Sequence, residues 1–279
     1  MSRSTLTTLL TIAMLAFAGN SLLCRLALRN TGIDAATFTT IRLLSGALTL
    51  WLIVRVRRGT IGTAGSWPSA LALFGYAAGF SFAYVMLPAA TGALLLFGAV
   101  QATMIGHGIW VRERIAPMQI LGCLLAFGGL VSFLLPGLTT PPLHGSLLML
   151  CAGAAWGIYS MRGRGANAPV KVTAGNFLRA APIAMALSVL TIGDASLDGA
   201  GVGYAIASGA LTSGVGYVIW YAVLPYLKGT QAASVQLSVP VITALGGALL
   251  LGESLSLRLM AASVVILGGI GLAIQERPS

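Results

Sequence analysis

Polar side chains that stand deep in apolar stretches are the residues of this chain best suited to chemistry. Four of them carry an amide or an imidazole: Asn20, Gln101, His107 and Gln236. An unpaired polar group is costly in hydrocarbon, so each must face a cavity or another helix. Amides both donate and accept hydrogen bonds, so they suit the ammonium and the carboxylate of an amino acid. We predict that these four bind a small polar substrate, with interhelical hydrogen bonds as the alternative.

Aromatic and hydroxyl side chains recur every four residues in two stretches, which places each set on one face of a helix. The sets are Tyr76, Phe80 and Tyr84 in the first stretch, and Ser213, Tyr217 and Tyr221 with Trp220 in the second; Trp156 is a separate candidate. Rings supply apolar contact and hydroxyls satisfy polar atoms, so we predict a shared central cavity. The alternative is a core seam or an interfacial belt, which Tyr84 and Tyr221, close to helix ends, would fit.

Charged groups inside the apolar stretches are few. His107 carries an imidazole and could relay a proton if transport is coupled to one. No Asp or Glu lies deep in an apolar stretch, so facilitated export is an equal alternative. Arg25, Arg42, Arg162 and Arg179 are expected to snorkel or to anchor loops near span ends. The alternative is that Arg42 or Arg179 attracts a substrate carboxylate.

The sequence lacks the residue patterns that disulfide-stabilised folds, metal sites, enzymes and nucleic-acid-binding proteins need. Cys24, Cys123 and Cys151 stand in apolar stretches and are interpreted as packing residues rather than a disulfide framework. No metal-ligand cluster, nucleophile motif or phosphate loop is found, so we expect no cofactor and no enzyme. The formal charge of +10 comes without a basic run, so no nucleic-acid partner is expected. A channel is a further alternative, but repeated charged rings are missing.

The elements that must position these residues are membrane helices. Hydrophobic residues make up 57% and charged residues 8% of the chain, whereas a soluble domain has about 25% charged residues. A span needs about 20 mostly apolar residues. An all-α polytopic protein of ten spans is predicted, with the first span retained rather than cleaved as a signal peptide. The predicted spans are Leu6–Leu28, Ala35–Val54, Pro68–Leu87, Thr91–Val111, Pro117–Leu135, Leu143–Met161, Ala174–Ile192, Ala200–Leu224, Thr230–Leu251 and Ser256–Ile274.

The chain repeats itself. Tyr-Val-Met-Leu-Pro ending at Pro88 returns as Tyr-Ala-Val-Leu-Pro ending at Pro225, 137 positions later, and the same offset pairs Arg42 with Arg179. Such agreement among scarce residue types indicates an internal duplication, with repeats at 1–140 and 141–279. Five spans per repeat is an odd number, so the second copy must enter the membrane inverted, as in many secondary transporters. The matched prolines end helices or, as a sharper hypothesis, act as hinges for gates.

Orientation follows from loop lysines and arginines, which favour the cytoplasm. If the N-terminus is cytoplasmic, far more positive residues lie inside than outside, so both termini are predicted to be cytoplasmic. The inside set is Arg3, Arg55, Arg57, Arg58, Arg112, Arg114, Arg162, Arg164, Lys171, Lys228 and Arg277, and the outside set is Arg25, Arg29 and Arg258.

The second half resembles a known family. Pro240 inside an apolar stretch, Gly252-Glu253 at its end and Gly268-Gly269 in the closing stretch are similar to the end of an EamA repeat of the drug/metabolite transporter superfamily. The first copy departs from this pattern, because Val100 stands at the position of Pro240. The variant from Phe97 to Met104 resembles the YddG-type aromatic amino acid exporters. Both resemblances imply an exporter of small metabolites, and the second implies amino acids.

Together these observations predict a secondary transporter in the cell inner membrane. It would export aromatic or other neutral amino acids by alternating access around a central cavity. Export of drugs or other small metabolites is the alternative. The expected partners are the substrate and the lipid bilayer, with protons left open. A monomer is expected, although the sequence does not fix the oligomeric state.

Overall fold

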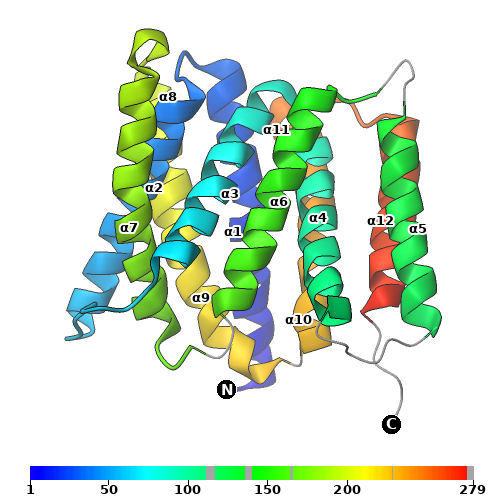
Figure 1. Ribbon diagram of the computed structural model, residues 1–279, viewed down its shortest axis with the longest axis horizontal. Coiled ribbons are helices and arrows are strands. Elements are labelled where there is room, and N and C mark those ends of the chain that lie inside the picture. The colour runs from blue at the N-terminus through cyan, green and yellow to red at the C-terminus, as the bar shows by residue number, and fades with distance from the viewer. Residues whose placement is uncertain (111–116, 136–139, 164–165, 228, 275–279) are drawn as a thin grey trace.

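The computed structural model describes residues 1–110, 117–135, 140–163, 166–227 and 229–274, and within them the chain forms helices and turns but no strand (Figure 1). Arg112, Glu113, Arg114, Arg164, Lys228 and Arg277 lie outside the described residues. The α-helices are α1 (Arg3–Asn30), α2 (Ala35–Val56), α3 (Trp67–Met86), α4 (Ala89–Trp110), α5 (Pro117–Leu134), α6 (Leu143–Gly163), α7 (Pro169–Leu190), α8 (Gly199–Ala207), α9 (Gly216–Val223), α10 (Gly229–Gln236), α11 (Ser238–Leu251) and α12 (Leu257–Ala273). Short elements are η1 (Ile192–Asp194), the π-helix η2 (Ser208–Val215) and η3 (Leu224–Tyr226).

Most helices suit a membrane. Eight helical stretches of the described chain are long and apolar enough to span one, and two of them, Gly199–Tyr226 and Ser234–Leu251, run through a junction between shorter elements. The apolar helix α12 has 17 residues and is shorter, and α6 is not among the eight. The chain is therefore a multi-pass membrane protein, and the count of ten spans stays a prediction.

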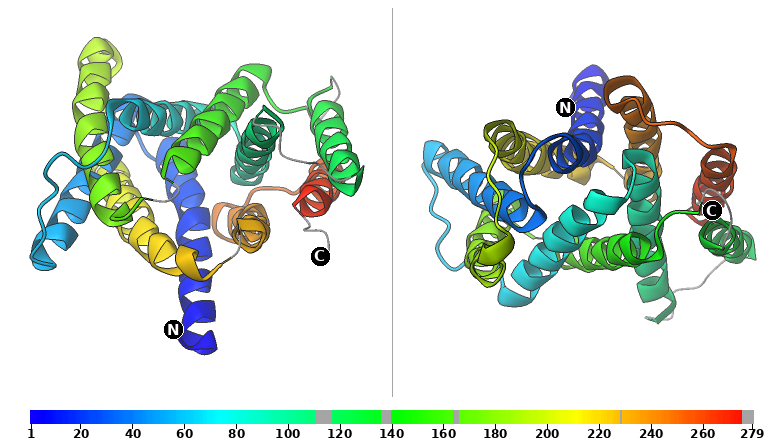
Figure 2. Two further views of the ribbon diagram at one scale, coloured as in Figure 1. Left: turned by 60° about the horizontal axis from the view of Figure 1, so that its bottom comes forward. Right: turned by 90° about the horizontal axis from the view of Figure 1, so that it is seen from above.

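The helices form a central group with one helix pair at each edge. The pair α2 and α7 lies at one edge, and the pair α5 and α12 at the opposite edge (Figures 1 and 2). Between these edges, α3 and α4 pack on α6, while α9 and α11 pack on α1. Helix α4 also packs on α11, so the central group joins the two halves of the chain.

Glycines let α5 and α12 approach closely. A Cβ atom on Gly122 would lie 2.5 Å from the backbone nitrogen of Ala273, and one on Gly269 would lie 2.6 Å from that of Ala126. Membrane helices associate through such small residues because lipid gives them little hydrophobic reason to pair. A Cβ atom on Gly128 or Gly268 would meet nothing within 4 Å, whereas one on the adjacent Gly129 would lie 2.9 Å from the Val265 side chain of α12.

A carboxylate ties two connections together at the end of the molecule where α1 finishes. Asp34 caps α2 by accepting hydrogen bonds from the backbone N–H groups of Ala36 and Thr37, and it also accepts one from Ser196. Burial alone would raise the pKa of Asp34, but these hydrogen bonds outweigh it and lower the pKa below its ordinary value. The start of α1 and the end of α12 both lie at the opposite end of the molecule (Figure 1).

Two predicted spans of the second half are interrupted, whereas the spans that the predicted repeat pairs with them, α3 and α4, are each one continuous helix. Between α8 and α9 the chain adopts the π-helix η2, and α10 ends at Gln236 before α11 begins. Pro240 accounts for the second break, because it offers no N–H to the carbonyl of Gln236 and its ring crowds that carbonyl. Helix α4 has Val100 at that position and is continuous.

Candidate functional site

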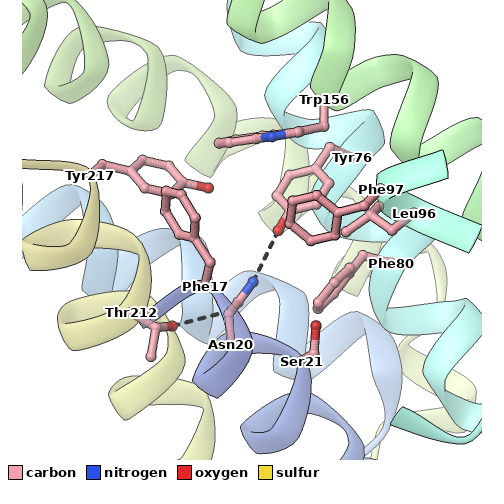
Figure 3. Close-up of a pocket in the computed structure, with 10 residues that line it drawn as sticks. All are labelled: Phe17, Asn20, Ser21, Tyr76, Phe80, Leu96, Phe97, Trp156, Thr212 and Tyr217. Carbon is pink, nitrogen blue, oxygen red and sulfur yellow. Dashed lines mark hydrogen bonds between the residues drawn. The ribbon is translucent and has the colours of Figure 1, made fainter. Parts of the chain in front are cut away.

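A small cavity lies at the centre of the helix group (Figure 3). It holds about 20 Å³, little more than the space that one water molecule needs. Six elements from both halves supply its lining: α1, α3, α4, α6, η2 and α9. The lining residues are Phe17, Asn20, Ser21, Tyr76, Phe80, Leu96, Phe97, Trp156, Thr212 and Tyr217. A larger molecule would enter only if some of these side chains moved apart.

Asn20 makes hydrogen bonds to several elements around the cavity. Its amide nitrogen donates to the hydroxyl of Tyr76 at 2.9 Å. Its amide oxygen accepts from the hydroxyls of Ser208 at 2.7 Å and Thr212 at 3.2 Å. Helix α1 therefore bonds to α3 in the first half and to η2 in the second half through one buried side chain. Asn20 therefore lines the cavity together with Tyr76 and also makes the interhelical hydrogen bonds that were its alternative role, so substrate binding by Asn20 stays a prediction.

Trp156 forms the roof of the cavity and joins aromatic rings of the two halves (Figure 3). Its ring centroid lies 4.8 Å from that of Tyr76 on α3 and 5.2 Å from that of Tyr217 on α9. Phe17 of α1 packs edge-on against Tyr217 at 6.0 Å. Tilted and edge-on pairs of this kind suit the charge distribution of aromatic rings. The rings of Trp156, Tyr217 and Phe17 form a flat apolar slot on one side of the cavity. The polar side chain of Asn20 lies on the other side and forms its polar base.

Among the residues that the structure describes, Arg42 is the largest fully buried side chain, with 2% of its surface exposed. Its Nη2 donates to the hydroxyl of Tyr76 at 3.0 Å, while its Nη1 has no hydrogen-bond partner. The guanidinium carbon lies 5.1 Å and 4.9 Å from the ring centroids of Tyr76 and Phe80. The expectation that Arg42 snorkels or anchors a loop is therefore wrong, because its charge lies directly behind the cavity wall.

Three of the predicted residues outside the cavity lie elsewhere in the bundle. His107 is exposed on the second half of α4, where its nearest ring is Trp110 at 6.2 Å. Gln236 ends α10 and is partly exposed. Trp220 is buried against Phe17, with ring centroids 5.7 Å apart, behind the cavity lining.

Two other predicted residues are buried beside the cavity without lining it. Gln101 is 2% exposed on α4, and its amide nitrogen has no hydrogen-bond partner; the hydroxyl of Ser213, 1% exposed, has none either. The π-helix explains Ser213. In a π-helix residue i bonds residue i+5, as the N–H of Gly216 does to Leu211, so Thr212 rather than Ser213 shares a face with Tyr217.

Five lining residues were not predicted: Phe17, Ser21, Leu96, Phe97 and Thr212. Phe17 and Ser21 stand three residues before and one after Asn20, on the stripe that helical spacing defines. Helical spacing from Asn20 could therefore have predicted both Phe17 and Ser21 as lining residues. Leu96 and Phe97 are apolar residues of an apolar helix, so nothing in their type or spacing predicts that they line a cavity. Thr212 is displaced from the predicted stripe by the π-helix.

Glu253 closes one end of the central group. Its Oε1 accepts from Nε of Arg25 at 2.9 Å and from Nη1 of Arg29 at 3.5 Å, and its Oε2 accepts from the backbone N–H of Ala89 at 2.7 Å. Arg25 also donates to the carbonyl of Tyr84 at 2.8 Å. Glu253, two residues beyond the end of α11, is thus tied to α1 and to the N-terminus of α4, which favours negative charge. We call this group the Glu253 clamp.

The four matched arginines are not equivalent. Arg25 belongs to the Glu253 clamp, whereas its counterpart Arg162 donates to the hydroxyl of Ser69 at 3.0 Å. Arg179, the counterpart of Arg42, donates to the carbonyls of Ala64 and Gly175 at 2.7 and 2.9 Å. Arg179 therefore anchors a loop as expected.

The matched prolines also differ. Pro88 precedes α4, and its carbonyl accepts from Gly92, so it begins that helix. It lines a second cavity of about 350 Å³ that also includes Glu253. Pro225 lies in η3 and is exposed.

Tyr84 and Tyr221 were given an interfacial belt as their alternative. Tyr84 is fully buried instead, with its hydroxyl donating to the carbonyl of Ala89 at 3.2 Å. A Cβ atom on Gly92 would lie 2.3 Å from the Tyr84 ring, so glycine makes room for it. Tyr221 is partly exposed. The belt alternative is therefore wrong for Tyr84.

Comparisons with known proteins match most of the chain. Residues 143–275 match the EamA-like transporter family. The Pseudomonas aeruginosa protein named Uncharacterized protein PA1977 is 57% identical over 273 residues, which are 97% of this chain and 95% of that protein. An uncharacterized transporter of Archaeoglobus fulgidus is 29% identical over 181 residues, 62% of this chain and 63% of its own length. A crystal structure at 20% identity covers 98% of this chain and 97% of its own, with a TM-score of 0.70, which shows a shared fold.

Proposed function

We propose that the chain is a transporter of the EamA-like family of the drug/metabolite transporter superfamily, which its residues 143–275 match, and that it exports amino acids by alternating access around the central cavity. Aromatic or other neutral amino acids are the proposed substrates. The observation that carries the proposal is the cavity, because both halves of the chain supply its lining. A site between two halves is what a carrier needs to present its substrate to each side in turn.

The packing of the helices supports an inverted repeat of 1–140 and 141–279. Exchange of the two sets of five spans leaves the pairs α2–α7, α4–α11 and α5–α12 unchanged. The same exchange turns the contacts of α6 with α3 and α4 into those of α1 with α9 and α11. The proposed architecture is thus ten spans related by a pseudo-twofold axis through the cavity.

The Glu253 clamp supports an assignment of the conformational state. It lies at the end of the bundle opposite the start of α1, and we propose that the start of α1 is cytoplasmic in the inner membrane. Positive residues of the described chain support this orientation, since Arg55, Arg57, Arg58 and Lys171 gather at the same end as the start of α1. The clamp then closes the extracytoplasmic mouth, while the small cavity holds the substrate site in a contracted form.

The lining favours an amino acid with a flat side chain. Trp156, Tyr217 and Phe17 form an apolar slot, and Asn20 with Tyr76 forms a polar base on the other side (Figure 3). A ring in the slot would bury apolar surface, while the polar base would orient the polar atoms. The resemblance of the stretch from Phe97 to Met104 to YddG-type exporters also supports aromatic substrates.

Counterflow in proteoliposomes tests this proposal. Vesicles that contain the purified protein and unlabelled phenylalanine are diluted into a trace of labelled phenylalanine. A carrier should accumulate the label transiently, because outward exchange of the internal pool drives its entry. Protein-free vesicles loaded in the same way are the control. Label entry that ignores the internal pool would indicate a channel, and absence of entry for a panel of neutral amino acids would contradict amino acid export.

A further inference from the structure

We propose that the cavity recognises a carboxylate, with Arg42 as its counter-ion and the hydroxyl of Tyr76 as its direct donor, and that a free amine is not required. This inference rests on the proposed function and names the chemical class of its substrate. The class is a small carboxylic acid with a flat apolar body, of which an aromatic amino acid is one example. Its evidence is an unmatched buried cation beside a cavity that offers hydrogen-bond donors.

The charge of Arg42 has no acidic partner in the described chain. The described ion pairs join Glu253 to Arg25 and Arg29 only. The other described acidic residues, Asp34, Asp194 and Asp198, lie in the connections at one end of the bundle. Burying an uncompensated cation within a membrane is costly, so such a residue usually faces an ionic partner or a substrate. Arg42 keeps its Nη1 without a partner at 2% exposure.

The Tyr76 hydroxyl is left as a hydrogen-bond donor by its neighbours. Its oxygen accepts from Nη2 of Arg42 and from the amide nitrogen of Asn20. The amide of Asn20 is oriented by the hydroxyl of Ser208, which donates to its oxygen at 2.7 Å; the hydroxyl of Thr212 lies 3.2 Å from that oxygen and donates to the carbonyl of Ser208 at 2.7 Å. A phenolic oxygen that accepts two hydrogen bonds still has its own proton to donate. That proton is free to meet an acceptor in the cavity.

Arg42 strengthens this donor even where it does not touch the substrate. A cation that donates to the Tyr76 oxygen draws electron density from the hydroxyl and favours a negative charge opposite its proton. The guanidinium also lies over the rings of Tyr76 and Phe80, about 5 Å from each centroid. If these rings move apart to enlarge the cavity, Nη1 becomes available to a carboxylate.

An ammonium group meets a different environment. No Asp or Glu is among the ten lining residues. The oxygen of Asn20 is already engaged by two hydroxyls, and the field of Arg42 opposes a second positive charge. An amine can lie against the faces of Trp156 and Tyr217, but without a counter-ion. The cavity therefore distinguishes compounds by the carboxylate and tolerates the amine.

Four probes with the same ring test this inference: phenylalanine, 3-phenylpropionate, phenethylamine and phenylalaninamide. Their binding to the purified full-length protein is measured by quenching of tryptophan fluorescence and by thermal shift. The two carboxylates should bind at least tenfold more tightly than the amine and the amide. Equal binding of 3-phenylpropionate and phenylalaninamide would overturn the inference, as would failure of all four to bind.

Matched variants separate recognition from structure. Arg42→Gln should reduce the preference for acid over amide to less than threefold, whereas Arg179→Gln, at the repeat-related position, should keep it. Tyr76→Phe should weaken acid binding, and Tyr84→Phe, two turns along the same face, should not. If Arg42→Gln does not fold, the Tyr76→Phe variant and the four-probe comparison decide whether the cavity recognises a carboxylate. A preference that survives in both folded Arg42→Gln and Tyr76→Phe proteins would contradict the inference.

Outcomes for the two proposals are distinguishable. Counterflow of phenylalanine together with equal binding of acid and amide would leave the carrier in place and remove the carboxylate site. A preference for acids without counterflow of any amino acid would remove amino acid export and leave the carboxylate site. The substrate would then be another small carboxylic acid, and counterflow in the same vesicles can be used to screen for it.

Discussion

At the scale of single residues, Trp156 has the most central position, because its ring touches aromatic rings of both halves. Each contact of this kind contributes about 0.5–1.5 kcal/mol beyond the burial of surface. The ring also covers the polar base formed by Asn20 and Tyr76. Any ligand larger than water must displace it or lie against it, so Trp156 should sense occupancy of the cavity directly.

Tryptophan fluorescence provides the corresponding test. Trp51, Trp67 and Trp110 are exposed on the outside of the bundle, and Trp220 is buried behind the lining. Trp156→Phe should remove most of the fluorescence change that phenylalanine or 3-phenylpropionate produces. Trp220→Phe should retain it. A ligand-induced change of unaltered size in Trp156→Phe would contradict the position assigned to the ligand.

Sequence reasoning identified part of this site. The positions of Asn20 and Tyr76 beside an internal cavity were predictable, because a lone amide and a tyrosine stripe in apolar helices must face a cavity or another helix. Arg42 was misjudged. It lies seven residues into α2, about 10 Å along the helix axis, which is too deep for an ordinary snorkelling position. Sequence alone gives that depth but not the direction of the side chain, which the packing of η2 and α3 around α2 decides.

At the scale of elements, the π-helix η2 decides which hydroxyl reaches the cavity. A four-residue period predicts Ser213 beside Tyr217, whereas the wider turn of η2 brings Thr212 there. Close packing accompanies it, since a Cβ atom on Gly209 would lie 2.1 Å from the carbonyl oxygen of Arg42. Nothing in the local sequence marks a π-helix, because tertiary packing against α2 selects it over the α-helix.

Paired substitutions in η2 test its register. Thr212→Val removes one of the two hydroxyls that hold the oxygen of Asn20, a loss of about 0.5–1.5 kcal/mol, or roughly two- to tenfold in affinity. Ser213→Ala removes a hydroxyl that has no partner and should leave affinity within about twofold. Affinity for 3-phenylpropionate measured for both variants gives the answer. A larger loss in Ser213→Ala than in Thr212→Val would show that the α-helical register is the working one.

The paired prolines yield a prediction about hinges. We expect Pro88→Ala to slow counterflow more than Pro225→Ala, because Pro88 begins α4 next to the Glu253 clamp while Pro225 is exposed in a short turn. Alanine restores an N–H and lets α3 and α4 join more continuously. Initial rates are compared at equal protein content. Unchanged rates in both variants would remove the hinge role from both prolines.

At the scale of the whole molecule, the proposed duplication would place a cavity between the two halves of the chain, where this one lies. Two halves with matching contacts meet along α1, α4, α6 and α11, and the cavity lies within this meeting place. The sequence predicts the spans and the repeats because scarce residues such as Pro88 and Pro225 keep their offset, and both stay predictions. The asymmetry was not readable, because the Glu253 clamp depends on contacts between residues more than 150 positions apart.

The most direct test of alternating access is the reactivity of a cysteine at Ser21, inside the cavity, in a protein whose three native cysteines are replaced. An impermeant maleimide is added from either face of oriented vesicles. We predict labelling from the N-terminal face, weak labelling from the opposite face, and a reversal of this ratio in Glu253→Ala, where the clamp is lost. Fast labelling from both faces at once, unaffected by Glu253→Ala, would contradict the account.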